Sequence, residues 1–457
     1  MTINPKVNFR FIPSVSSLLE ETEIAQNPLA PQIKTELLRK IISEVKNLSI
    51  LPDSKEKFTT LILDKFKAKF EILNSNPYPK VINGTGIILH TGLGRASYSE
   101  KAKEYLNETV KNYAQVEFDL KNGKRGDRQS EIKKILQILT GAESSLIVNN
   151  NAAAVLLILN TFAKNKETII SRGELVEIGG SFRMPEIMEM SQTKMIEVGA
   201  TNKTHLKDYQ KAISANTGLL TKIHTSNYRV LGFTKEVTLN EMVSLGKKKS
   251  IPTYYDLGSG LFFPPNEFGL SDEPTVQEIL QSGVDLVSFS GDKAIGGSQS
   301  GIILGSKKLI EKLAKNPLMR TLRPCKLTLS VLAGTLQDIL LGKDSFEKIP
   351  VLKMFNESNS VTKERVKRFL KLVKTSSSFK IVETELTAQS GSGAFPIQEI
   401  PSYGIEISSN KLSDEEIFHL LLENSIVGYR QNTKVVLNFK TIHEDELETL
   451  ANSLSEI

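Results

Sequence analysis

Cysteine is nearly absent from this sequence, since only Cys325 among 457 residues carries a thiol. A single cysteine cannot close a disulfide within the chain, and it excludes zinc or iron–sulfur sites built from several cysteines, so we expect no metal. Apolar runs approaching about 18 residues are also lacking, and the start, MTINPKVNFRFIPSVSSLLEE, has no basic stretch leading into an apolar one. We therefore expect a cytoplasmic protein with no membrane segment.

The remaining composition is that of an ordinary globular protein. Hydrophobic residues make up 39% and charged residues 24% of a length that allows two or three domains. Lys plus Arg number 58 and Asp plus Glu 52, which leaves a formal net charge of +6. This excess permits a polyanionic partner but does not require one.

The apolar pattern changes along the chain and predicts several parts. From Val15 to about Ile72, apolar residues recur at helical spacing, and the proline-containing NSNPYPK follows as a linker. Short β-rich runs such as SLIVNN, ETIISRG, KMIEVG and VDLVSFS then alternate with helical segments, which predicts an α/β fold with a mainly parallel central sheet. The predicted boundaries are residues 1–73 for a helical domain, 74–90 for the linker and start of the core, 91–335 for the large α/β domain and 336–457 for a small α+β domain.

A lysine stands in a small, glycine-rich turn between two apolar strands in VDLVSFSGDKAIGGSQSGIILG. In enzymes that use pyridoxal 5′-phosphate (PLP), a lysine on such a hairpin bonds the cofactor, and a serine three residues earlier commonly binds its phosphate. These roles would fall on Lys293 and Ser290. The alternative is a solvated lysine in an ordinary turn.

An aspartate precedes this lysine by some tens of residues, at the end of the apolar strand in IPTYYDLGSG. A carboxylate at that edge can keep the pyridine nitrogen of PLP protonated, which makes the ring an electron sink. Asp256 is our candidate, and its alternative role is to cap the turn before Gly258.

Two further segments follow strands and predict a ligand at the same edge of the sheet. In SLIVNNNAAAVLLIL, Asn150, Asn151 and Ala152 open a helix whose N-terminus suits a phosphate, although such caps also occur without ligands. In KIHTSNYRVLGF, His224 could stack on a cofactor ring or could be a packed, hydrogen-bonded core residue. The run NGTGIILHTGLGRA follows no strand in the manner of a dinucleotide-binding fingerprint, and we reject that interpretation.

Together these blocks resemble the family of bacterial selenocysteine synthase, the L-seryl-tRNA(Sec) selenium transferase. The resemblance is carried, in order, by VINGTGIILHTGLGRA, VNNNAAAVLLILN, SRGELVEIGGSFRMPEIM, VGATNKTH, KIHTSNYRVLGFTK, DLGSG and VSFSGDKAIGGSQSGIILG. Departures are small: family members often have a different residue at Gly84 and commonly a proline at Ser298, and neither position supplies essential chemistry.

The resemblance implies a fold-type-I PLP-dependent transferase with Lys293 as the Schiff-base lysine and Asp256 as the pyridinium partner. It further implies that Arg95, Arg320 and Arg323 bind the anionic group of selenophosphate. The reaction would replace the hydroxyl of serine carried by tRNA(Sec) with selenium. The helical residues 1–73 would grip the tRNA, and the protein would be a homo-oligomer, a decamer built as a pentamer of dimers.

Two alternatives stay open from the sequence. One is a PLP-dependent lyase acting on a small amino-sugar phosphate, and the other is a catalytically silent RNA-binding homologue. The N-terminal helices distinguish the first alternative, because such a lyase has no use for them. Absorbance of a lysine-bound cofactor distinguishes the second.

Overall fold

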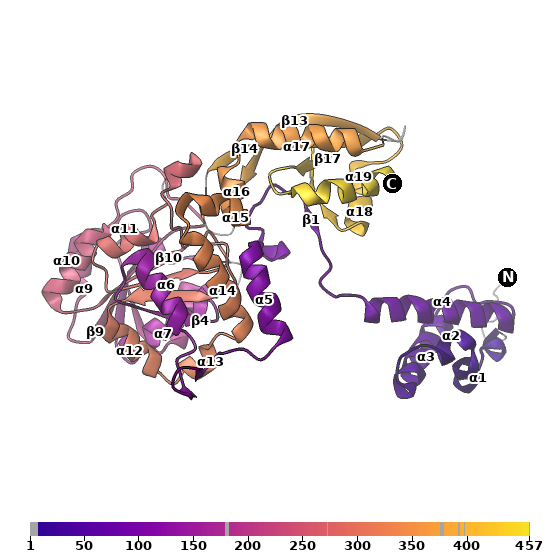
Figure 1. Ribbon diagram of the computed structural model, residues 1–457, viewed down its shortest axis with the longest axis horizontal. Helices are drawn as coiled ribbons and strands as arrows, with labels where there is room; N and C mark the ends of the chain where they lie inside the picture. Colours follow the sequence, from indigo (N-terminus) through magenta and orange to yellow (C-terminus); the bar gives the residue numbers. More distant parts are fainter. Residues whose placement is uncertain are drawn as a thin grey trace. The chain divides into compact units, whose positions relative to one another are not determined.

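The computed structural model describes residues 8–178, 182–271, 273–374, 379–391, 394–396 and 398–456. The chain divides into two units, Met1–Lys80 and Val81–Ile457 (Figure 1). Gly179, Gly180 and Ser181 of the SRGELVEIGGSFRMPEIM block lie outside the described residues. No helix among those described is long and apolar enough to cross a membrane.

The N-terminal unit is helical, as its apolar periodicity predicts. Two short helices precede two long ones: α1 (Val15–Glu20), α2 (Thr22–Ala25), α3 (Pro31–Lys46) and α4 (Lys55–Asn74). Helix α3 begins with proline at its first turn, and the Ser54 side chain caps α4 by accepting from the Lys57 amide. One stripe of each long helix is buried, and it comprises Leu38, Ile41 and Val45 of α3 and Phe58, Ile62 and Phe66 of α4. This unit therefore has a small core of its own.

A seven-stranded sheet forms the centre of the second unit. Its order is β4 (Ser144–Val148), β12 (Gly301–Gly305), β11 (Leu286–Ser290), β10 (Thr253–Gly258), β9 (Thr217–Ile223), β5 (Glu167–Ser171) and β8 (Lys194–Val198). Strand β12 is antiparallel to both of its neighbours, and the other pairs are parallel. The predicted mainly parallel sheet is confirmed. The carboxyl ends of β4, β9, β10 and β11 consequently meet at one edge.

Helices cover both faces of this sheet (Figure 1). They are α5 (Glu100–Lys111), α6 (Ser130–Thr140), α7 (Asn151–Ala163), α8 (Met184–Met190), α9 (Leu206–Ala212), α10 (Leu239–Lys249), α11 (Val276–Gln281), α12 (Lys307–Lys315), α13 (Met319–Leu322) and α14 (Lys326–Ile339). Successive strand residues point to opposite faces, so Ile302 belongs to one apolar cluster and Ile303 to another. Apolar clusters on both faces thus hold the sheet between its helices.

The C-terminal part is α+β, with an antiparallel sheet ordered β13 (Phe379–Gln389), β14 (Glu399–Ser409), β17 (Lys434–Asn438) and β16 (Tyr429–Gln431). Its helices are α15 (Ser345–Lys348), α16 (Pro350–Asn356), α17 (Asn359–Leu372), α18 (Asp414–Glu423) and α19 (Leu447–Glu456). Strand β1 (Ile82–Asn83) pairs with β15 (Ile426–Val427), so the start of this unit lies beside its C-terminal part. The hairpins β2 (Phe118–Asp119)–β3 (Lys124–Arg125) and β6 (Glu177–Ile178)–β7 (Phe182–Arg183) complete the strands of the described residues.

Candidate active site

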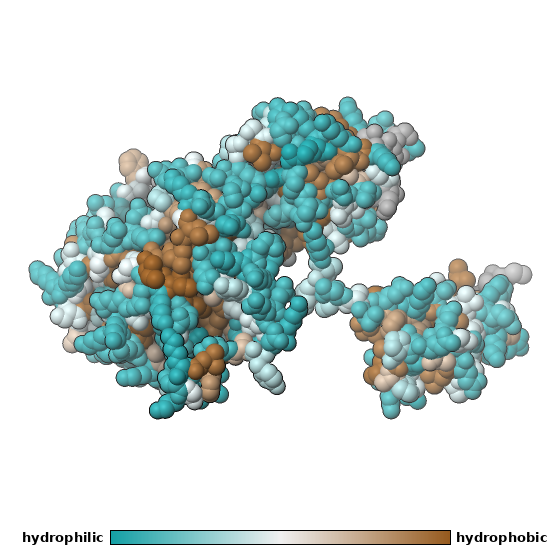
Figure 2. All heavy atoms as spheres, in the orientation of Figure 1, coloured by the Kyte–Doolittle hydropathy of each residue, from teal (hydrophilic) through white to brown (hydrophobic). Residues whose placement is uncertain are grey.

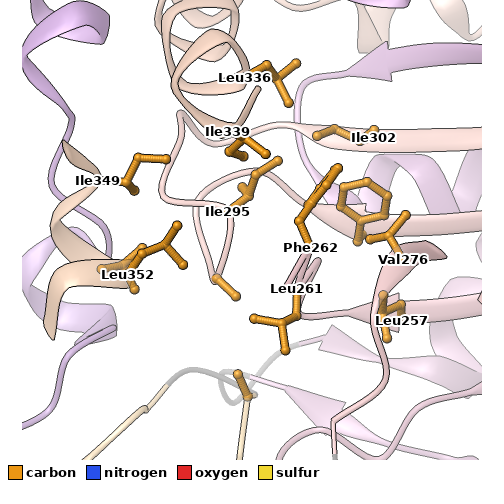
Figure 3. Close-up of a cluster of buried hydrophobic side chains, with 14 of the residues drawn as sticks. Leu257, Leu261, Phe262, Val276, Ile295, Ile302, Leu336, Ile339, Ile349 and Leu352 are labelled. Carbon is orange, nitrogen blue, oxygen red and sulfur yellow. The ribbon is translucent and has the colours of Figure 1, made fainter. Parts of the chain in front are cut away.

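The turn between β11 and β12 holds Lys293 inside the protein. The lysine is only 5% exposed, which contradicts the solvated-turn alternative. The turn is closed by its own backbone, since the Gly296 amide donates to the Lys293 carbonyl at 2.9 Å. Two residues on, Ile295 is buried among Leu336 and Ile339 of α14 and anchors the turn to the core (Figure 3). Apolar packing thus positions the lysine.

Burial makes Lys293 an unusually weak base. Loss of solvent lowers its pKa below the ordinary lysine value, and the charge of Arg95 lowers it further. Asp256, Asp292 and Glu273 oppose this effect, but the net direction is downward. The amine is therefore neutral at a lower pH than that of a solvated lysine, as a nucleophile requires.

Asp256 lies on the neighbouring strand β10 and is also buried. Asn151 Nδ2 donates to its Oδ1 at 2.8 Å, and Ser288 donates to the same oxygen at 3.4 Å. Burial raises the pKa of Asp256, while the hydrogen bonds and the charge of Lys293 oppose the rise. A Cβ at Gly258, two residues on, would lie 3.9 Å from Lys293 Nζ, so the amine lies against the end of β10. The structure thus brings the predicted carboxylate and amine together.

His224 follows β9 and lies beside Asp256, whose carbonyl accepts from the His224 amide at 2.9 Å. Its Nε2 is 3.1 Å from Glu273 Oε2, and its Nδ1 is 3.3 Å from the Tyr255 hydroxyl. The ring is hydrogen-bonded at both nitrogens, as the core alternative expects, and it is close to the cofactor candidates as well. Sequence reasoning missed Glu273, because it belongs to a loop with no pattern that indicates a function.

The two asparagines at the start of α7, Asn150 and Asn151, make different hydrogen bonds. Asn150 caps the helix, since its side chain accepts from the Ala153 amide at 2.8 Å. Asn151 reaches across to Asp256, and Ala152 continues the first helical turn. Ser290 ends β11 at the same edge of the sheet and is buried.

The three candidate arginines lie in two places. Arg95, with a left-handed φ of 60°, donates to Asp292 at 2.9 Å, directly beside Lys293 in the sequence. Arg320 of α13 is exposed, and Arg323 pairs with Glu117 at 3.0 Å. Of these three arginines, only Arg95 therefore has a hydrogen bond to the Lys293 turn among the described residues. Asp292 was overlooked in the sequence although it immediately precedes the lysine.

Several buried polar atoms around these residues have no partner in the described protein. They are Asn151 Oδ1, Ser259 Oγ and Glu273 Oε1. Ser259 accepts from the Ala294 amide through its carbonyl at 3.2 Å, so its hydroxyl is next to the lysine turn. Unpaired buried polar groups are rare in folded proteins, and this concentration fits a polar ligand. The site therefore fits PLP: the amine of Lys293 would bond the PLP aldehyde, and the carboxylate of Asp256 would face the ring nitrogen. No group of three or more potential metal ligands occurs among the described residues.

Comparison with known proteins decides the family. Residues 81–443 match the family model described as L-seryl-tRNA selenium transferase. The L-seryl-tRNA(Sec) selenium transferase of Clostridium botulinum (strain Loch Maree / Type A3) is 40% identical, covering 100% of both chains. That of Alkaliphilus oremlandii is 40% identical over 98% of each. The chain belongs to the L-seryl-tRNA(Sec) selenium transferase family.

A solved structure supports the fold of this transferase. D-glucosaminate-6-phosphate ammonia-lyase aligns with a TM-score of 0.56 and 16% identity, covering 84% of this chain and 98% of that one. Such low identity speaks for the fold alone. The predicted family, its fold-type-I architecture and its PLP cofactor are confirmed.

Proposed function

We propose that Lys293 and Asp256 hold PLP in this L-seryl-tRNA(Sec) selenium transferase. The enzyme converts seryl-tRNA(Sec) to selenocysteinyl-tRNA(Sec), with loss of the serine hydroxyl and addition of selenium from selenophosphate. One observation carries the assignment: a buried amine and a buried carboxylate face the same edge of a parallel sheet, where such sheets bind ligands.

PLP, when bound, withdraws electrons from the α-carbon of the seryl group and so makes its proton acidic. The carboxylate of Asp256 would pair with the ring nitrogen, and Asn151 holds that carboxylate in place. Burial lowers the pKa of Lys293, which favours the neutral amine that can bond the cofactor and later take the α-proton. The apolar anchor of Ile295 keeps the amine directed at the site and away from bulk water.

The cofactor phosphate is assigned to the first turn of α7 and to Ser290. Because the Asn150 side chain already serves the Ala153 amide, the backbone N–H groups of Asn151 and Ala152 are those left for an anion. The positive end of the helix dipole supports the same choice.

Arg95, Arg320 and Arg323 are assigned to the selenium donor. Guanidinium groups form paired, charge-assisted hydrogen bonds with phosphate-like anions. Arg95 is placed by Asp292 beside the lysine turn, whereas Arg320 is exposed and Arg323 is partly so. We propose that the latter two act where subunits meet.

We also propose that the protein assembles as a decamer, a pentamer of dimers, in which Arg320 and Arg323 lie where subunits meet. The second unit exposes large apolar side chains, and Figure 2 shows apolar residues gathered on its surface near α6. The most exposed examples along α5, α6 and the β2–β3 hairpin are Val110, Tyr113, Phe118, Leu120 and Ile138. Large apolar side chains left exposed in such number are typical of protein interfaces.

The helical unit is assigned to gripping tRNA(Sec), and the enzyme to the cytoplasm, where charged tRNA is used. Through Lys80 the chain has 12 Lys and Arg against 9 Asp and Glu. A net charge of +3 is modest. We therefore expect affinity for the tRNA to fall as the salt concentration rises, but we do not expect charge to supply all of the affinity. The full-length match to its relatives includes these helices.

Incubation of the protein with PLP, seryl-tRNA(Sec) and labelled selenophosphate tests the function. The expected result is labelled selenocysteine esterified to the tRNA, and no labelled product with Lys293→Ala. Activity on a free amino-sugar phosphate, with none on the charged tRNA, would instead favour the lyase. A protein that binds tRNA but shows no absorbance from lysine-bound PLP would be the silent homologue.

A further inference from the structure

A carboxylate and a phenol enclose His224 from its two nitrogen ends. Glu273 Oε2 lies 3.1 Å from Nε2, and the Tyr255 hydroxyl lies 3.3 Å from Nδ1. The Glu273 side chain is 0% exposed and that of His224 is 10% exposed. Neither partner can therefore be replaced by bulk water.

The chemistry of the two partners is not symmetrical. An ionised carboxylate only accepts hydrogen bonds, so its neighbour Nε2 must carry the proton. A tyrosine hydroxyl can donate or accept, and burial raises the pKa of Tyr255 well above its ordinary value, which keeps its proton in place. Tyr255 can thus donate to an unprotonated Nδ1.

We infer that Glu273 is a positioning residue that holds His224 as the neutral tautomer protonated at Nε2. The bond to the carboxylate is charge-assisted and roughly twice as strong as the neutral bond from Tyr255, so Glu273 decides the tautomer. Asp256 and Lys293 are the other titratable groups nearby: Asp256 interacts electrostatically with His224, and Lys293 with Glu273.

The consequence for catalysis rests on the proposed function. Both ring nitrogens are occupied by the protein, so His224 has none to offer to a substrate. It can contact the cofactor only through its ring, which leaves movement of the α-proton to Lys293 Nζ. Two residues before Glu273, the Ser271 amide donates to the Gln398 side-chain oxygen at 2.9 Å, which joins this loop to the C-terminal part.

Solid-state NMR of the full-length PLP enzyme, labelled with ¹⁵N-histidine and kept in mildly alkaline buffer, tests the inference directly. The chain has 5 histidines, and subtraction of the His224→Asn spectrum identifies the resonances of His224. We expect a protonated Nε2 with a strongly downfield proton and an unprotonated Nδ1. A proton on Nδ1, alone or together with Nε2, would overturn the inference.

Two nearly isosteric variants provide matched controls. Glu273→Gln removes the charge, so either the Nε2 proton signal moves upfield or the proton transfers to Nδ1. Tyr255→Phe should leave the Nε2–H signal in place. The inference fails if Glu273→Gln leaves that signal unchanged, or if only Tyr255→Phe alters it. Because this readout needs no turnover, it is separate from the proposed function, which would fail if Lys293 bound no PLP.

Discussion

The buried ion pair between Lys222 and Glu174 tests how much burial strengthens an ion pair in this fold. Lys222 Nζ lies 3.0 Å from Glu174 and 3.0 Å from Glu236. The two carboxylates are equally close but differently solvated, since their side chains are 9% and 79% exposed. Glu174 also accepts from the Ile223 amide at 3.1 Å, next to His224.

Glu174→Gln should destabilise the enzyme by about 3–5 kcal/mol, the usual cost of breaking a buried pair. At 3 Å, Coulomb's law gives about 5 kcal/mol at an effective dielectric constant of about 20, but only about 1 kcal/mol in water. The amide oxygen of glutamine can also serve only one of the two donors. Glu236→Gln is the control, and we expect it to cost less than about 1 kcal/mol.

Urea unfolding at a fixed chain concentration measures both variants, and hydrogen exchange of the β9 amides locates the change. Exchange should be faster in Glu174→Gln than in Glu236→Gln. Equal losses of unfolding free energy in the two variants would refute the argument, because distance alone would then govern both pairs.

The same pair predicts a pH dependence. Burial lowers the pKa of Lys222, but Glu174 and Glu236 outweigh burial and raise it above the ordinary value of 10.5. A raised folded-state pKa stabilises the fold below the unfolded-state pKa, and this contribution is lost as the pH rises through the folded-state value. The difference in unfolding free energy between wild type and Glu174→Gln should therefore shrink in strongly alkaline buffer, where Lys222 loses its proton, and also in acid, where a protonated Glu174 resembles glutamine.

Three predictions concern the cofactor site. Arg95→Gln removes a positive charge near Lys293, so the pKa of that amine should rise and the pH profile of PLP uptake, followed by absorbance, should move to higher pH; an unmoved profile would contradict the assigned electrostatics. Asp256→Asn should still bond PLP but lose about 10²–10³-fold in kcat, and near-normal turnover would exclude Asp256 as the ring partner. Gly301→Ala would drive a Cβ into the Asn150 backbone and displace the start of α7, so PLP titration should show about 10–100-fold weaker binding, whereas unchanged affinity would argue against phosphate at that helix.

The sequence alone predicted the sheet and placed Asp256 and Lys293 as candidates at the same edge of it. Apolar runs bounded by glycine and asparagine predicted the strands that carry Asp256 and precede Lys293, because the periodicity of a strand is a local property. The parallel arrangement then implied that their carboxyl ends meet at one edge. Family resemblance added the reaction, which no local pattern specifies.

Only the tertiary structure decided which side chains face one another. The contacts between Asn151 and Asp256, His224 and Glu273, and Arg95 and Asp292 join positions 105, 49 and 197 residues apart. Such contacts depend on how helices pack across the sheet, and no residue spacing encodes them. For the same reason the burial of Lys293, which lowers its pKa, follows from the packing of Ile295 against α14 and from no local pattern.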